Sequence, residues 1–224
     1  MGRGKQTAAG RSDLVWYAAY GSNMHFDRLA YYLSGGRPPD AARTYPGCRD
    51  SARPLRTAPV FLPGQVVFAL ESHAWTGGLG LYAPDVGGWT PARAYLMSAA
   101  QFSDVAAQEM YRETGSHLDL GRVLAEGRAT FGPGRYETLA CAGNLHEHPV
   151  LTFTCAKPPR AAELNSPAPD YLRHLASGLA EAHGWDARRI AAHLARRPGA
   201  AGRWRAADIA DLIGSPAAVA RNHA

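Results

Sequence analysis

Apolar positions change period close to the start of the chain. Residues 14–19, Leu-Val-Trp-Tyr-Ala-Ala, form a continuous apolar run with the β-branched and aromatic side chains typical of a buried strand. The apolar residues that follow recur at helical spacing and predict one face of an amphipathic helix. They are Phe26, Leu29, Ala30 and Leu33. The change of period falls on residues 20–24, so a strand is expected to turn into a helix there.

This turn has the sequence Tyr20-Gly21-Ser22-Asn23-Met24. Gly21 can adopt backbone angles that a side chain resists, and Asn23 is a candidate N-cap for the helix. Amide groups without partners at a helix start favour an anion or a polarised carbonyl oxygen. The turn is therefore a candidate binding loop, although a simple connection between two elements would look similar.

The rest of the pattern predicts alternating strands and helices. Residues 37–63 are rich in Pro, Arg and Asp and show no period, which indicates a long loop with one short strand. The segment 118–131 is ambiguous. Strands are predicted at 66–70, 79–82, 92–97, 135–141 and 150–155, and helices from Ser98 onward and at 170–183, 186–197 and 206–213.

The helix that begins at Ser98 carries the main candidate for chemistry. Ser98 and Gln101 fit a capping box. Glu109 shares one helical stripe with four apolar residues, and a carboxylate there is costly unless it is paired or has a raised pKa. A raised pKa suits a general acid or base. The alternatives are that Glu109 pairs with an arginine or lies at the margin of the stripe; Glu113 is the second choice.

Bulk properties limit the class of protein. The 224 residues carry 24 Lys and Arg against 19 Asp and Glu, an excess that permits nucleic-acid contact without favouring it, since no aromatic residues alternate with the arginines. Three cysteines (Cys48, Cys141, Cys155) form no metal-binding or disulfide pattern, and His146 and His148 lack a third ligand. Residues 1–12 are expected to be a disordered tail, with no secretion signal and no membrane span. These features predict a cytoplasmic protein, and the Ala, Gly and Arg bias indicates a bacterial source.

Four motifs, in one order, resemble the γ-glutamylcyclotransferase family. The first is the turn at residues 20–24, which is similar to the glutamyl-binding loop of those enzymes. The others are Trp75-Thr76-Gly77-Gly78-Leu79, then Ala94-Tyr95-Leu96-Met97 followed by Asp104 and Gln108-Glu109, and finally Pro167-Ala168-Pro169-Asp170-Tyr171 with Gly178, Glu181 and Gly184. Met24 stands where leucine is commoner, and a tyrosine expected shortly after the helix of the glutamate is not evident in register.

The resemblance implies an α+β fold, with a small, largely antiparallel β-barrel flanked by helices over residues 13–185 and a helical C-terminal extension over 186–224. It implies cyclisation of an N-terminal γ-glutamyl group to 5-oxoproline, with release of an amine or amino acid. Glu109 would be the catalytic acid and base, and no metal or other cofactor is implied. The implied substrate-binding residues are Tyr20, Gly21, Ser22, Asn23, Met24, Trp75, Gly77, Gly78 and Tyr171. The expected partner is a small γ-glutamyl molecule, and the expected state is a monomer or homodimer without a membrane.

Two other functions remain open at this point. An amide hydrolase or acyltransferase on the same fold would use Glu109 to activate water or another acceptor. A binding protein without catalysis would use the turn at residues 20–24 to hold an anion.

Overall fold

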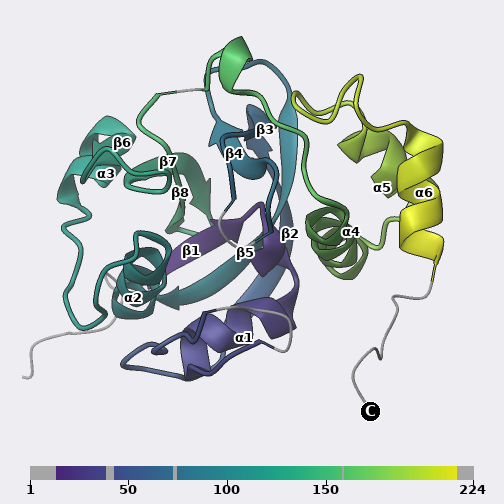
Figure 1. Cartoon of the computed structure of the whole chain (residues 1–224). Coiled ribbons are helices and arrows are strands. Elements are labelled where there is room, and N and C mark those ends of the chain that lie inside the picture. The colour runs from purple at the N-terminus through teal and green to yellow at the C-terminus, as the bar shows by residue number, and fades with distance from the viewer. Residues whose placement is uncertain (1–13, 39–42, 73–74, 158, 216–224) are drawn as a thin grey trace, which may run out of the picture.

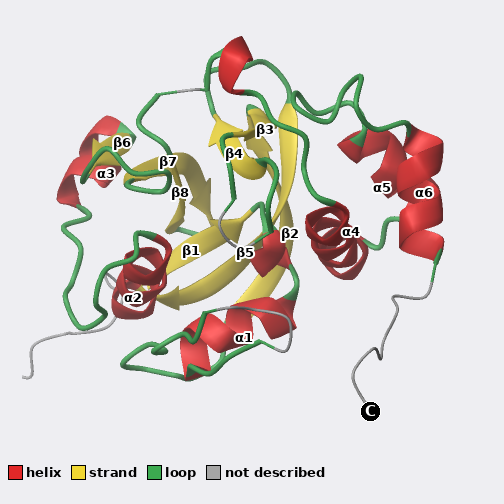
Figure 2. Cartoon of the chain, viewed as in Figure 1, coloured by secondary structure: helices red, strands yellow, loops and turns green. Residues whose placement is uncertain are grey.

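The structure, a computed structural model, describes residues 14–38, 43–72, 75–157 and 159–215. It is an α+β protein with a mixed six-stranded sheet at its centre and helices around it (Figures 1 and 2). The strand order of this sheet is β2-β5-β1-β8-β7-β6, and β3 and β4 form a separate two-stranded sheet. The strands span Leu14–Ala19 (β1), Arg56–Pro63 (β2), Gln65–Ala69 (β3), Leu79–Ala83 (β4), Trp89–Ser98 (β5), Arg128–Thr130 (β6), Thr138–Leu145 (β7) and His148–Thr154 (β8).

The strand β1 is central because it is apolar on both faces. Its residues from Val15 to Ala19 are all buried, as expected for a strand covered on two sides. It pairs with β5 in antiparallel register, with Tyr17 opposite Tyr95, and with β8 in parallel. The other ladders of the sheet are antiparallel, which confirms the largely antiparallel expectation. The end of β1 therefore delivers residues 20–24 to the middle of the molecule.

The expected barrel is wrong, because the sheet stays open among the described residues. Its edges are β2 and β6, and no ladder joins them. The edge strand β2 contains Pro59 and Pro63, which lack the N–H that a second ladder needs. After Pro63 the chain turns at Gly64, whose φ of 105° favours glycine, and enters the separate β3–β4 pair.

The segment 37–63 contains the one strand expected there, but this strand is longer than expected: it is the eight-residue β2 at the end of the segment. Alternation of exposed and half-buried positions is characteristic of an edge strand, and the prolines hide that pattern in the sequence. Residues 39–42 of this segment, the tail at 1–12 and residues 73–74 lie outside the described residues.

Two helices lie against the central strands near the end of β1. They are α1 (Phe26–Ser34) and α2 (Ala99–Glu109). The capping box predicted for α2 is confirmed: the Gln101 amide donates to Ser98 Oγ at 3.1 Å, and the Ser98 amide donates to Gln101 Oε1 at 3.2 Å. The two helices are joined by Gln108, whose Nε2 donates to the backbone oxygen of Tyr32 at 2.9 Å. Glu109 is thus the last residue of a helix that is fixed at both ends.

Between α2 and β8 the predicted boundaries needed correction. The ambiguous segment contains a short helix, α3 (Gly121–Glu126), followed by β6. The strand predicted at 135–141 begins only at Thr138, since residues before it turn across Gly134. His146 and Glu147 form the tight turn between β7 and β8, with φ values of 45° and 67°.

The C-terminal part is helical, as predicted. It comprises α4 (Pro169–His183), α5 (Ala187–Leu194) and α6 (Ala206–Gly214). Figure 1 shows α5 and α6 beyond α4, on the side away from α2 and α3. Ile190, Leu194 and Ile209 belong to the same buried cluster as the strand residues. The amide of Phe68 donates to the backbone oxygen of Pro198 at 2.8 Å. None of the helices in the described ranges is long and apolar enough to cross a membrane.

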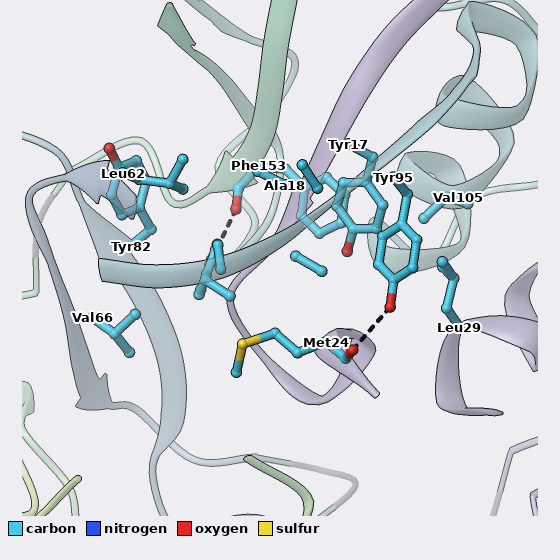
Figure 3. Close-up of a cluster of buried hydrophobic side chains, with 14 of the residues drawn as sticks. Tyr17, Ala18, Met24, Leu29, Leu62, Val66, Tyr82, Tyr95, Val105 and Phe153 are labelled. Atoms are coloured by element: carbon cyan, nitrogen blue, oxygen red, sulfur yellow. Dashed lines mark hydrogen bonds between the residues drawn. The ribbon is translucent and has the colours of Figure 1, made fainter. Parts of the chain in front are cut away.

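The core lies between the sheet and these helices and is rich in aromatic residues. Trp16, Tyr95 and Phe102 are among its largest fully buried side chains. Tyr17 stacks on Phe153, with ring centroids 5.2 Å apart. Figure 3 shows the rings of Tyr17, Tyr95 and Phe153 between strands and helices, with the Tyr95 hydroxyl bound to the backbone oxygen of Met24 at 2.9 Å. The core therefore reaches directly under the turn that follows β1.

Gly178 sets the distance between α4 and this turn. A Cβ at residue 178 would stand 2.6 Å from Met24 Cβ and 3.1 Å from the His25 nitrogen. Gly178→Val is expected to lower the free energy of unfolding by about 2 kcal/mol through overpacking. Ser177→Val, at an exposed position of the same helix, is the control for helix propensity. Urea denaturation of both variants checks this, and equal losses would contradict it.

Candidate active site

The turn between β1 and α1 contains a short 3-10 helix, Ser22–Met24. The prediction for Gly21 was wrong in its reason, since its φ of −106° is open to any residue. Gly21 lies instead under Tyr171, whose hydroxyl would be 3.5 Å from an added Cβ. Asn23 is not the N-cap of α1 either. The N-cap residue of α1 is His25. The amide of Phe26, at the start of this helix, donates to Glu181 Oε2 of the distant helix α4 at 3.0 Å.

The carbonyl groups of this turn are fixed from one side. Tyr95 donates its hydroxyl to the backbone oxygens of Asn23 and Met24, each at 2.9 Å, and Arg93 donates to that of Met24 at 3.2 Å. Arg93 also pairs with Glu181. The amides of Gly21, Ser22 and Asn23 have no acceptor among the described residues. The turn is thus anchored through its carbonyl oxygens, while these three amides have no protein acceptor in the described part of the chain.

Asn23 connects the turn to Glu109. Its Nδ2 donates to Glu109 Oε1 at 3.2 Å and to the Tyr17 hydroxyl at 3.3 Å. The side-chain amide is buried, and its Oδ1 has no partner among the described residues. This contact brings together residues that are 86 positions apart. It answers the question left open for Glu109, because the hydrogen bonds to its carboxyl come from the neutral side chains of Asn23 and Tyr32, and no arginine in the described part of the chain is within ion-pair distance.

Burial raises the pKa of Glu109 above its usual value. Hydrogen bonds from Tyr32 and Asn23, and the charges of Arg28 and Arg43, act in the opposite direction without cancelling this effect. The carboxyl is also at the C-terminal end of α2, where the helix dipole disfavours a negative charge. The remaining exposure of Glu109 is to a cavity, so a ligand there could exchange protons with it.

This cavity has a volume of about 480 Å³. Its size is within the range of roughly 300–1,000 Å³ that is common for small-molecule sites. The wall is unusually rich in tyrosine and holds three arginines and two glutamates. Lining residues are Tyr17, Tyr20, Gly21, Ser22, Asn23, Arg28, Tyr32, Arg43, Tyr45, Ser72, Trp75, Leu79, Gly80, Glu109, Met110, Tyr111, Gly134, Arg135, Tyr136, Glu137, Phe153 and Tyr171.

The structure brings together seven of the ten residues proposed from the sequence. These are Glu109, Tyr20, Gly21, Ser22, Asn23, Trp75 and Tyr171, all in the cavity wall. Trp75 and Tyr171 are stacked, with ring centroids 5.8 Å apart. Tyr20 donates its hydroxyl to the Phe153 backbone oxygen at 2.8 Å, and this bond fixes its ring in the wall.

Met24, Gly77 and Gly78 do not line the cavity. Met24 is buried below the turn in the core (Figure 3). The two glycines lie against a neighbouring segment of the chain: added Cβ atoms would stand 2.5 Å from the Ser166 oxygen and 2.2 Å from the Asn165 oxygen, respectively. They permit a close approach of two backbones, not of a ligand to the backbone.

Sequence reasoning missed most of the polar wall. Arg28, Tyr32 and Tyr45 lie in the cavity, with Arg28 Nη2 donating to the Tyr45 hydroxyl at 2.6 Å. Arg28 and Tyr32 flank the apolar stripe of α1, and Tyr45 belongs to the segment without a period, so none of the three positions gave a local signal. Gly80 was missed too; a glycine within a strand often marks a close contact, here with the Tyr171 hydroxyl at 2.8 Å from an added Cβ.

The tyrosine expected after the helix of Glu109 has two candidates in the cavity wall, Tyr111 and Tyr136. The hydroxyl of Tyr136 donates to the Gly80 oxygen at 3.0 Å. As for metals, the described residues contain no group of three or more His, Cys, Asp or Glu side chains that could hold an ion. His146 is at the hairpin turn between β7 and β8, outside the cavity wall.

Comparisons with known proteins give distant likenesses. No family model matches the chain. Histone deacetylase 5 of Arabidopsis thaliana is 28% identical over 193 residues, which are 76% of this chain and 29% of that protein, so the chain spans less than a third of its length. An uncharacterized human protein of known structure has a TM-score of 0.49 at 15% identity, covering 91% of this chain and 100% of that one. A γ-glutamyl cyclotransferase structure has a TM-score of 0.46 at 14% identity, covering 90% and 98%.

Proposed function

We propose that this chain is a γ-glutamylcyclotransferase-like enzyme. It would cyclise an N-terminal γ-glutamyl group to 5-oxoproline and release an amine or amino acid. The observation that carries the proposal is the position of Glu109, whose carboxyl is held by Asn23 Nδ2 at 3.2 Å in a cavity beside the turn at residues 21–23. The sequence motifs described above supply the substrate class.

Glu109 would act as base and then as acid. As a carboxylate it takes a proton from the α-ammonium of the glutamyl group, and the free amine attacks the γ-carbonyl carbon of the same molecule. A C–N bond forms and closes the five-membered ring. After the attack the ring nitrogen carries two protons and the former carbonyl oxygen carries a negative charge. Glu109 gives its proton to the leaving nitrogen, the C=O bond re-forms as the original amide C–N bond breaks, and the carboxylate is restored. The second proton of the ring nitrogen passes, through Glu109 or water, to the basic released amine, which leaves as an ammonium. A raised pKa brings the acid and base forms of Glu109 closer to balance at neutral pH.

The turn at residues 21–23 would support the γ-carbonyl oxygen. This oxygen becomes negative in the tetrahedral intermediate, and preorganised amide donors stabilise such charge. The amides of Gly21, Ser22 and Asn23 have no acceptor among the described residues, and the Tyr95 hydroxyl fixes the turn by donating to the backbone oxygens of Asn23 and Met24. Because the nucleophile is part of the substrate, the protein mainly has to hold the glutamyl group folded.

The pH dependence of the reaction provides one test of this role. Asn23 donates to the Glu109 carboxylate and so lowers its pKa. Asn23→Ala is expected to move the acidic limb of kcat/KM to higher pH, because the charged form loses this hydrogen bond, and to lower the plateau about tenfold. Asn23→Asp should move the limb further, since a second carboxylate opposes ionisation. The pH profile of the wild-type protein with the same substrate is the control for ionisation of the substrate. An acidic limb of kcat/KM that stays unchanged in both variants would contradict a carboxylate base at Glu109.

The direct experiment is a substrate panel. The purified chain is incubated with γ-glutamyl amino acids, γ-glutamyl amines and glutathione, and 5-oxoproline is measured by mass spectrometry. Stoichiometric 5-oxoproline and free amine from at least one compound are expected. Free glutamate instead would indicate a hydrolase, in which Glu109 activates water. Saturable binding without any product would indicate a binding protein.

A further inference from the structure

Arg28 is a buried cation in the wall of the cavity. It lies on α1, and only 8% of its surface is exposed. Its guanidinium carbon is 5.0 Å from the ring centroid of Tyr45, 5.7 Å from that of Trp75 and 5.9 Å from that of Tyr32. Three rings from separate parts of the chain therefore hold one planar cation in place.

Within the described part of the chain, this cation has no carboxylate partner. No Asp or Glu oxygen is within 4.0 Å of its nitrogens, its one hydrogen bond goes to the neutral hydroxyl of Tyr45, and its Nε is buried without an acceptor. Arg93, in comparison, pairs with Glu181. A buried guanidinium with unused donors is costly unless an anion can reach it.

The charge around Arg28 also favours an anion. Arg43 lines the same cavity, with its guanidinium carbon 4.4 Å from the Tyr111 centroid and 5.0 Å from that of Tyr45. Of the two glutamates in the wall, Glu137 is paired with Arg112. Glu109 alone faces the cavity with its acceptor oxygens bound to neutral donors. A ligand with a negative group would therefore enter a site with an excess of positive charge.

We propose that Arg28 binds a carboxylate of the substrate. This inference rests on the proposed function for the identity of the ligand, a γ-glutamyl compound. A planar guanidinium held by aromatic rings presents parallel N–H groups to a carboxylate, which a lysine does not. Such a carboxylate has two sources in this substrate class: the α-carboxylate of the glutamyl group itself, or the carboxylate of a leaving amino acid.

Two pairs of probes distinguish these sources in a calorimetric binding experiment. γ-Glutamyl-alanine and γ-glutamylethylamide differ only in the carboxylate of the leaving group. 5-Oxoproline and 5-oxoprolinamide differ only in the carboxylate of the glutamyl group. Turnover of the first pair is avoided by using the Glu109→Gln background. Wild-type Arg28 is expected to favour the carboxylate member of one pair by about 10- to 100-fold, the range of a hydrogen bond to a charged group.

Arg28→Gln should abolish that preference, and Arg28→Lys should keep part of it. Loss of the preference in the first pair assigns the leaving-group carboxylate; loss in the second assigns the glutamyl carboxylate. Arg53→Gln is the matched control, since Arg53 is over the ring of Phe26 at 4.6 Å but does not line the cavity. Thermal denaturation shows whether each variant is folded. If Arg28→Gln does not fold, the test is made with Arg28→Lys alone.

The result that overturns the inference is an affinity for all four probes that changes by less than about twofold in Arg28→Gln and Arg28→Lys. This readout is independent of catalysis. Carboxylate selectivity through Arg28 in a protein that releases no 5-oxoproline would remove the proposed function and keep the carboxylate site. Release of 5-oxoproline without carboxylate selectivity through Arg28 would keep the proposed function and remove the carboxylate site.

Discussion

Glu109→Gln is expected to reduce the release of 5-oxoproline by about 10²- to 10⁴-fold, the usual contribution of a general acid or base. Glutamine has the same shape and can still bind Asn23, so the cavity should keep its form. It cannot accept a proton at neutral pH, and therefore neither the deprotonation of the substrate ammonium nor the return of the proton is assisted. Initial rates followed by mass spectrometry at saturating substrate give the loss in kcat.

Glu113→Gln is the matched control for this variant. Glu113 is exposed, does not line the cavity and lies four residues after Glu109, beyond the end of α2. The variant Glu113→Gln loses the same negative charge from the same region of the chain. Its rate of 5-oxoproline release should therefore stay within about twofold of the wild-type rate. A large loss in Glu113→Gln, or an active Glu109→Gln with an unchanged melting temperature, would remove Glu109 as the acid and base.

Asp104→Asn is expected to lower the free energy of unfolding by about 3 kcal/mol, since it removes the charge of a buried carboxylate that is bound by the partly exposed Arg49 and by two backbone amides. Asp104 is 0% exposed. It accepts from the amide and the Nε of Arg49, at 2.9 and 3.0 Å, and from the Gly115 amide at 3.0 Å. An asparagine would turn an N–H₂ group toward one of these donors. In a chain of this size the melting temperature should fall by roughly 5–10 °C.

The effect of Asp104→Asn should depend on pH. Burial by itself raises the pKa of Asp104, but the hydrogen bonds from Arg49 and from the amides outweigh it and hold the pKa below its usual value. A depressed pKa stabilises the fold above the unfolded pKa of about 3.9, and this stabilisation is lost as the pH falls through the lower, folded pKa. The difference between wild type and variant in urea should thus be full at pH 7 and shrink below about pH 4.

Asp85→Asn provides the comparison for Asp104. Asp85 pairs with Arg128 at 3.8 Å, but its side chain is 76% exposed. Exposed pairs contribute at most about 1 kcal/mol, so this variant should unfold almost as wild type does. Equal losses in the two variants, or a loss in Asp104→Asn that is constant from pH 7 to pH 3, would show that the ion pair does not act as described.

The helix α2 and its glutamate were accessible from the sequence because their signals are local. The capping box needs only Ser98 and Gln101, and the apolar stripe that includes Phe102 and Val105 needs only helical spacing. The unusual place of Glu109 in that stripe was visible in the same window. Its partner was not, since Asn23 is 86 residues away and the same side chain serves equally well as an N-cap in a local interpretation.

The open sheet could not be predicted either. Pairing of β1 with β8, and the edge position of β2, depend on contacts between distant segments, and resemblance to a barrel fold gave the wrong closure. Pro59 and Pro63 are compatible with an edge strand, but in the sequence alone prolines argue against any strand. The α+β class, which the resemblance implied, was right.

The sequence by itself determined the helices other than α3, most of the strands, the turn at residues 20–24 and the candidate Glu109, because each depends on neighbouring residues in the chain. Tertiary structure decided which of those residues share a cavity: it placed Met24, Gly77 and Gly78 in packing roles and brought Arg28 and Tyr45 into the wall. Charge and burial at a site are sums over segments that are far apart in the chain. The buried guanidinium of Arg28, without a carboxylate partner among the described residues, and the raised pKa of Glu109 therefore exist only in the folded molecule.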